Sequence, residues 1–455
     1  QNTLFTDCNM PLTMESSGAL RVFGNNLDVK VLDSTFVNIQ QGAIYLTTNN
    51  STVLYDGVTV KDCRGTGYNF RTLVFERTNL VMQNLTITNN TVTNRGVLYV
   101  QFSNSKVRLS SSIFTYNTIV GTLPVNETDL KVNCGAFRIS EIAQETDNDS
   151  DIIFETSYLA YNKGSYGFGG SAVLTQDNAT YTMRHNVFER NQGDSAGGHY
   201  YNPNSPLIGV GNIINNTFIG NIGEFGAGLE IVIESTAPVN IINNTFDSNE
   251  TPSKGKANGG LYVYALIGQD VLVTAEGNRA VNDSLYFEVP TLTVPRGQSA
   301  VIDGLYYILV GNVLVLPFDS DLQISGEFQV VRTELVVTVP SLITLDSANV
   351  SLIRYESMNA SFESVQIRDD TGATCEPDSA SYGPKAFSIT MACKSNTPPM
   401  EPQPPSVNVG AIVGGVIGGV AFLAIVIILA IVLWKRNQKL RAHKTLTQAL
   451  ANQNT

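Results

Sequence analysis

Apolar and polar residues alternate in short runs along most of this chain, and the runs recur around one phrase. Its clearest copies are IINNTFIGN at Ile213–Asn221 and IINNTFDSN at Ile241–Asn249. Two or three alternating runs per unit, with turn residues between them, predict short β-strands rather than helices. One apolar anchor recurs in each unit at intervals of 24 to 30 residues, except for one interval of 45. The anchors are Phe36, Val60, Ile87, Phe114, Leu159, Phe188, Phe218 and Phe246.

A unit of this size cannot bury its own apolar face, so successive units must stack and share one core. We therefore predict an all-β ectodomain, a right-handed parallel β-helix, with the anchors stacked inside. A second strand led by glycine follows the anchors, as in GAIYL at Gly42 and GGLYVYA at Gly259, and glycine permits sharp turns. A propeller, the rival interpretation, would need about 40 to 45 residues per blade.

An asparagine ends the anchor phrase in the clearer copies. Asparagine tolerates the left-handed turn conformation, and its amide can hydrogen-bond to the asparagine of the next coil. We therefore expect a ladder formed by Asn117, Asn162, Asn191, Asn221 and Asn249.

The phrase disappears after residue 283, so residues 1–283 are predicted as the β-helix repeats. Strand-like runs continue through 284–395, for example LYYILV at Leu305 and ELVVTV at Glu334. This β-rich, membrane-proximal region could consist of shorter coils with a cap, or of a separate sandwich. We favour the cap because a solenoid needs protected ends.

The remaining residues predict a membrane attachment. A proline-rich stalk is expected at 396–408, a transmembrane α-helix at 409–434, and a basic cytoplasmic tail at 435–455. The run from Gly410 to Trp434 is uncharged and longer than the roughly 20 residues that a spanning helix needs. Lys435 and Arg436 follow it, which places the N-terminal bulk outside the plasma membrane in a single-pass topology. Glycines four residues apart on one helix face predict homodimerisation through Gly410, Gly414 and Gly418.

Acidic residues outnumber basic ones, and the net charge of -12 disfavours nucleic acid as a partner. The basic residues from Lys435 onward have no acidic neighbours, so the two ends of the chain are expected to face different environments. No basic-then-apolar leader precedes Gln1, although an outside orientation requires one. Removal of a signal peptide would explain this; we favour a fragment, because 4–36 already reads as repeat material.

Five cysteines are too few for a disulfide scaffold. Cys375 and Cys393 are the expected bridge, since closing a loop of that length stabilises by about 3 kcal/mol in an oxidising compartment. Two buried thiols are the alternative. The pairing of Cys8, Cys63 and Cys134 stays open.

The Phe-x-x-Asn phrases, such as Phe188 to Asn191 and Phe218 to Asn221, pair with GGA[I/L/V]-like segments such as Gly135-Ala136-Phe137. Over roughly 33–265 this pairing resembles the polymorphic outer-membrane protein repeats, within the right-handed β-helix, pectin-lyase-like superfamily. The resemblance implies a surface-displayed adhesin or passenger. Those proteins end in a membrane barrel, whereas this chain looks like a single-pass, receptor-like surface protein.

Enzymes built on this fold pair carboxylates across a groove or use a Ca²⁺ cluster with a basic residue. The adjacent acid pair Asp369-Asp370 lies outside the repeats, and three histidines leave little material for a metal site or a catalytic triad. The stretch ETDNDSD at 145–151 lacks the glycine spacing of an EF-hand. We therefore expect no enzymatic activity, no cofactor and no metal site.

Aromatic residues at turns offer a ligand surface, because exposed rings on a rigid lattice can pack on sugars or peptides. The candidates are Tyr166, Phe168, His199, Tyr200 and Tyr201; the alternative is that these rings pack between coils. The expected function is recognition or adhesion, with an extracellular carbohydrate or protein as ligand. A membrane-tethered carbohydrate-active enzyme and a truncated signalling receptor are the alternatives. Asn-x-Ser/Thr triplets add glycosylation candidates at Asn84, Asn126, Asn178, Asn215, Asn243, Asn282, Asn349 and Asn359.

Overall fold

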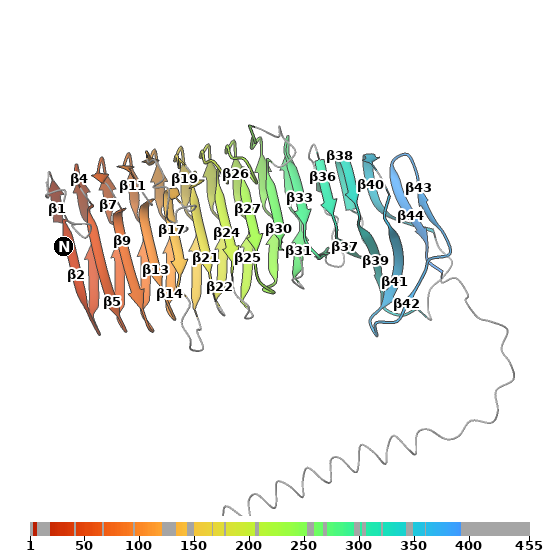
Figure 1. Cartoon of the computed structure of the whole chain (residues 1–455), viewed down its shortest axis with the longest axis horizontal. Coiled ribbons are helices and arrows are strands. Elements are labelled where there is room, and N and C mark those ends of the chain that lie inside the picture. The colour runs from red at the N-terminus through yellow and green to blue at the C-terminus, as the bar shows by residue number, and fades with distance from the viewer. Residues whose placement is uncertain are drawn as a thin grey trace, which may run out of the picture. The chain divides into compact units, whose positions relative to one another are not determined.

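The chain folds into stacked coils of short strands (Figure 1). All strand pairs of the described residues are parallel except three at the C-terminal end. The described part is therefore a parallel β-helix. This computed structural model describes residues 3–6, 19–40, 42–65, 68–93, 96–120, 133–142, 150–165, 167–176, 179–204, 209–252, 259–266, 271–294, 301–302, 306–319, 322–342, 349–359 and 361–392.

Three long sheets line the coils, and a small sheet joins β8 (Arg64–Gly65), β12 (Thr91–Val92) and β16 (Thr118–Ile119). Sheet 1, which carries the anchors, contains β1 (Thr3–Thr6), β4 (Ser34–Val37), β7 (Thr59–Lys61), β11 (Thr86–Thr88), β15 (Ile113–Thr115), β19 (Tyr158–Ala160), β23 (Val187–Glu189), β26 (Thr217–Ile219), β29 (Thr245–Asp247) and β32 (Arg279–Val281). Sheet 2, which holds the glycine-led strands, contains β2 (Leu20–Asn25), β5 (Ile44–Asn49), β9 (Tyr68–Phe75), β13 (Gly96–Phe102), β17 (Asn133–Glu141), β20 (Gly167–Phe168), β21 (Ser171–Thr175), β24 (His199–Pro203), β27 (Leu229–Ile233), β30 (Leu261–Ala265), β33 (Ser284–Glu288), β35 (Val301–Ile302), β36 (Tyr306–Val310), β38 (Leu322–Val331), β40 (Asn349–Asn359), β43 (Ala380–Tyr382) and β44 (Ala386–Thr390). Sheet 3 contains β3 (Asp28–Leu32), β6 (Thr52–Asp56), β10 (Asn79–Gln83), β14 (Lys106–Ser110), β18 (Asp151–Glu155), β22 (Thr180–Arg184), β25 (Val210–Ile214), β28 (Val239–Ile242), β31 (Leu272–Glu276), β34 (Thr291–Thr293), β37 (Val313–Pro317), β39 (Glu334–Val339), β41 (Ser364–Asp369) and β42 (Thr374–Cys375).

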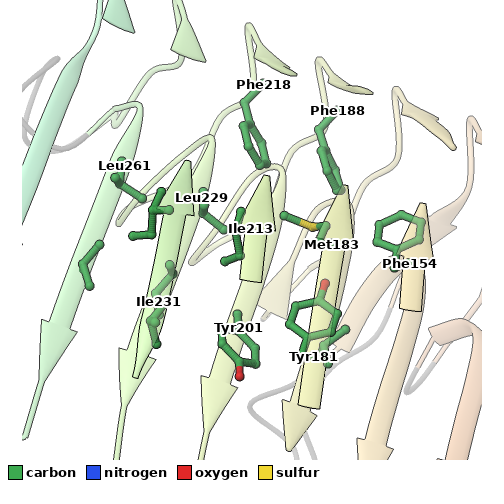
Figure 2. Packing of buried hydrophobic residues seen from close by; sticks show 14 of the residues in the cluster. Phe154, Tyr181, Met183, Phe188, Tyr201, Ile213, Phe218, Leu229, Ile231 and Leu261 are labelled. Carbon is green, nitrogen blue, oxygen red and sulfur yellow. The ribbon is translucent and has the colours of Figure 1, made fainter. Parts of the chain in front are cut away.

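The eight anchors stand opposite one another in sheet 1, and all are fully buried. The rings of Phe188 and Phe218 lie 4.8 Å apart at 7°, and those of Phe218 and Phe246 lie 5.1 Å apart at 6°. Figure 2 shows Phe188 and Phe218 beside each other in the shared core. The predicted stacking is confirmed. Burying one such side chain contributes about 1.5–3 kcal/mol.

The asparagine ladder also exists, and it is longer than predicted. From Asn90 to Asn249, each Nδ2 donates to the Oδ1 of the next coil at 2.9 or 3.0 Å. The last rung reaches Asp283, whose Oδ2 accepts from Asn249 Nδ2 at 2.6 Å. The expected left-handed conformation falls one residue earlier, as at Tyr161 and Arg190, each before a ladder asparagine. That preceding residue turns the chain so that the next side chain points inside.

A second ladder, which was not predicted, runs along the corner between sheets 3 and 1. The Nδ2 atoms of Asn186, Asn216 and Asn244 each donate to the Oδ1 of the next coil at 3.0 to 3.1 Å, and the last acceptor is Asn278. Left-handed residues again come just before, as His185, Asn215 and Asn243 show. Buried polar groups are thus paired at two corners of the coil.

Glycines let successive coils approach closely where sheet 2 begins. A Cβ at Gly198 would lie 2.3 Å from the carbonyl oxygen of Gly228, and one at Gly170 would lie 2.1 Å from that of Gly198. No side chain fits at these distances, because the obstacle is backbone.

Within the described ranges, sheet 1 ends at β32, and the later coils contain strands of sheets 2 and 3 alone. Thr291, Val313 and Glu334 stand opposite one another at spacings of 22 and 21 residues, so these coils are shorter. The anchor phrase is absent there because it is the sequence of a sheet 1 strand. Pairing of β33 with β30 and of β34 with β31 carries the stack across residue 284.

Antiparallel strands close the C-terminal end, where β44 pairs with β40 and with β43. Cys375 in β42 is disulfide-bonded, while Cys63 and Cys134 are buried and form no disulfide. The partner is therefore Cys8 or Cys393, both outside the described residues. The bridge from Cys375 to Cys393 stays a prediction.

The predicted fold class requires one correction. It joined the β-helix to a transmembrane α-helix, but the described residues hold strands and no helix long and apolar enough to cross a membrane. Their apolar residues alternate along strands and fill the coil interior instead. The stalk at 396–408, the segment at 409–434 with Gly410, Gly414 and Gly418, and the tail at 435–455 lie outside the described residues.

Candidate functional site

Alternate residues of sheet 2 point into the core and away from it. His199 and Tyr201 in β24 point inward and are 0% and 1% exposed. His199 bonds through Nδ1 to Ser171 Oγ at 2.7 Å and through Nε2 to Tyr181 Oη at 3.0 Å. Burial lowers the pKa of His199 to about 3, so the ring is neutral. Neither residue can reach a ligand, and their assignment to a ligand surface is wrong, because every second residue of the strand is interior.

Phe168 and Tyr200 lie on the outer side of sheet 2, with rings 4.0 Å apart at 14°. With Cys134, Ala172 and Ala196 they belong to a small apolar cluster outside the main core. Phe168 is only 4% exposed, whereas Tyr200 is partly exposed. Of the predicted ligand residues, Tyr200 thus remains accessible. Tyr166 lies outside the described residues.

The outer face of sheet 2 carries a continuous row of arginine and tyrosine in its N-terminal coils. We call it the Arg-Tyr row. Strand pairing sets its members side by side, and cation-π contacts join them. The guanidinium of Arg71 lies 5.2 Å from the ring centre of Tyr45, and that of Arg138 lies 5.6 Å from Tyr99. The row is Arg21, Tyr45, Arg71, Tyr99 and Arg138.

The outward positions next to the row carry no negative charge. The next outward positions of the same strands are Phe23, Thr47, Leu73, Gln101 and Ser140, none of them acidic. Within the described part of the chain, Arg21 and Arg138 form no ion pair. Arg138 Nε is buried and has no hydrogen-bond partner there. On a chain of net charge -12, this face is locally cationic.

Beyond the apolar cluster the same outward position changes character. Tyr200, Glu230, Tyr262 and Tyr286 stand side by side. Glu230 is 6% exposed, and its Oε2 accepts from Ser195 Oγ at 2.7 Å. Burial raises its pKa to about 7. The outer face therefore has a cationic N-terminal half and an aromatic, acidic C-terminal half.

Acidic side chains are the candidate metal ligands of this chain. Within the ranges that the structure describes, no three His, Cys, Asp or Glu residues gather closely enough to hold an ion. Asp369 Oδ1 accepts from Thr371 Oγ1 and from the amides of Thr371 and Ala373, so this carboxylate organises a turn. Most of the acidic stretch at 145–151 lies outside the described residues.

The glycosylation candidates follow the corners of the coil. Four of them are exposed residues with φ between 48° and 54°, and a buried residue follows each one: Asn84, Asn215, Asn243 and Asn282. Asn349 and Asn359 are exposed at the two ends of β40, while Asn126 and Asn178 lie outside the described residues. Corner geometry thus accounts for half of these triplets, since it favours Asn followed by a buried residue and a strand.

The sequence matches no protein-family model, no curated protein and no solved structure with which it was compared. The similarity to polymorphic outer-membrane protein repeats is accordingly supported only as far as the parallel β-helix.

Proposed function

We propose that this protein binds an elongated acidic carbohydrate along the outer face of sheet 2, without cleaving it. The observation that carries the proposal is the Arg-Tyr row. Adjacent strands lie about 4.8 Å apart, so arginines in every second coil repeat at about 9.6 Å. Such a row can contact several anionic groups of one extended chain.

The two residue types suit complementary parts of such a ligand. The guanidinium group presents a planar fork of donors that pairs with carboxylate or sulfate oxygens. Of the two tyrosines between the arginines, Tyr45 is partly exposed and offers a flat apolar face for a sugar ring, whereas Tyr99 is 7% exposed. An acidic peptide would use the forks but has no flat apolar ring in every unit, so carbohydrate is favoured.

A recognition role outside the cell agrees with the exposed Asn-x-Ser/Thr corners. The absence of cleavage is part of the proposal because the row contains no carboxylate that could act as acid or base. The nearest outward carboxylate along the same position is Glu230, beyond the apolar cluster.

The test is calorimetric titration of the purified full-length chain with galacturonate oligomers, with neutral glucose oligomers and polyglutamate as comparison ligands. The galacturonate oligomer should bind most tightly, and its affinity should fall as salt rises. Arg71→Gln combined with Arg138→Gln should weaken binding at least tenfold, whereas Lys106→Gln on sheet 3 should not change it. The proposal would be refuted if the double arginine variant bound the galacturonate oligomer as tightly as Lys106→Gln, or if polyglutamate bound more tightly than the galacturonate oligomer. Release of reducing ends would refute the absence of cleavage.

A further inference from the structure

The C-terminal half of the outer face contains a buried carboxylate that forms no ion pair with a described residue. Glu230 in β27 is 6% exposed, and within the described residues no lysine, arginine or histidine forms an ion pair with it. Ser195 Oγ donates to Oε2 at 2.7 Å, and no described group bonds to Oε1. Burying a carboxylate with one hydroxyl as partner is costly. An apolar side chain at this outward position would avoid that cost.

Aromatic rings flank this carboxylate on both sides. Tyr200 and Tyr262 stand opposite Glu230 in the two adjacent strands. The ring of Tyr262 is also 5.0 Å from that of Tyr286 and 5.7 Å from that of Phe225. Burial is the main cause of the raised pKa of the Tyr200 and Tyr262 hydroxyls, and the charge of Glu230 adds to it. The carboxylate and the rings are therefore close enough to act on one bound group.

We propose that Tyr200, Glu230 and Tyr262 form a cage for a basic side chain, arginine above all, of a protein partner. The faces of aromatic rings attract cations, and the attraction grows when water is excluded. A guanidinium is weakly hydrated, stacks on rings and pairs with a carboxylate through two donors, so it suits this site better than an ammonium group. A single thin side chain can also reach a carboxylate that is almost covered, which a whole amino sugar cannot.

Among the described residues, the further charged groups that act on the tyrosines of the cage are acidic. The negative charge of Glu234 helps to raise the pKa of Tyr200, and that of Glu288 helps to raise the pKa of Tyr262. Tyr286 Oη donates to Glu288 Oε2 at 3.1 Å. These acids attract a cationic segment and disfavour an acidic one. This site is separate from the Arg-Tyr row and does not depend on the proposed function.

The test uses saturation-transfer NMR on the full-length protein with three short peptides: acetyl-Gly-Arg-Gly-amide, its citrulline analogue, which is neutral and nearly isosteric, and its lysine analogue. A glucosamine oligomer tests whether a cationic carbohydrate binds the site in place of a basic side chain. We expect the arginine peptide to bind most tightly, at least tenfold above citrulline. Its affinity should rise with pH through about 7, where Glu230 ionises.

Two variants locate the site. Glu230→Gln keeps the size and the acceptor for Ser195 and should weaken arginine binding at least tenfold, and Tyr262→Leu should weaken it while leaving Glu230 in place. Glu334→Gln, at an exposed position of sheet 3, should leave binding unchanged. Equal signals for arginine and citrulline, unchanged binding by Glu230→Gln, or tighter binding of the glucosamine oligomer would each overturn the proposal.

Discussion

Replacing one rung of the first ladder tests what holds the coils in register. Asn221 Oδ1 accepts from the amide and from Nδ2 of Asn191, both at 3.0 Å. Its own Nδ2 donates to the carbonyl of Phe188 and to Asn249 Oδ1, both at 2.9 Å. Both Asn191 and Asn221 are fully buried. Asn221→Ala therefore leaves two donors of Asn191 without an acceptor, in a place that water cannot reach.

An unpaired buried donor costs about 1–3 kcal/mol, so the two together should cost about 2–6 kcal/mol. A matched control is Asn212→Ala, which removes the acceptor of a single bond from Asn240 at 2.9 Å. Asn212 is partly exposed, and water can replace the lost partner. The control should therefore cost less than about 1 kcal/mol.

Stacked coils can open locally, so the measurement is hydrogen exchange resolved along the chain rather than one global transition. Asn221→Ala should lower the protection of the amides in β23, β26 and β29 about 30-fold or more, since 1.4 kcal/mol corresponds to a factor of ten. Loss of protection no greater than in Asn212→Ala would show that packing of the anchors alone sets the register.

Three further outcomes are expected. Phe218→Ala should cost about 3–5 kcal/mol in urea unfolding, as large truncations in a packed core do; a cost below about 1 kcal/mol would contradict the stacked position. Burial raises the pKa of Asp283 to about 7, above its value in the unfolded chain, so its contribution to stability is complete below about pH 4 and is lost as pH rises through 7. Asp283→Asn should remove this pH dependence. The prediction would be contradicted if the free energy of unfolding differed between pH 5 and pH 8 by the same amount in the variant as in the unaltered chain. Expressed in a eukaryotic secretory pathway, Asn215→Gln and Asn243→Gln should each shorten the mass shift produced by an N-glycosidase, and equal shifts would mean that these corners are not modified.

The sequence predicts the interior well because its constraints are strict there. Phe188, Phe218 and Phe246 occupy one position of a nearly identical phrase, and only stacking satisfies all three. The second ladder was harder to predict, since its residues vary among Ser112, Ser157 and asparagines such as Asn186. Serine and asparagine side chains can both accept a hydrogen bond from the backbone amide, so the bonding is kept although the residue type differs.

The prediction of ligand-surface residues was partly wrong because exposure was judged from residue type. His199 and Tyr201 look like ligand residues, yet the alternation of the strand places them inside. The useful signal is positional. The fourth residue from the leading glycine is Tyr45 after Gly42, Arg138 after Gly135 and Tyr200 after Gly197, and all three point outward.

Register connects the stability of the coils to this outer face. A slip of one residue in a strand of sheet 2 would exchange inward and outward side chains. Arg138 would then enter the core, and its neighbour Phe137, which is fully buried, would face solvent. The ladder at the corner that leads into sheet 2 pairs one defined residue of each coil with its equivalent, as Asn117 does with Asn162. The buried asparagine side chains that fix the register of the coils thus also determine which side chains are available to a ligand.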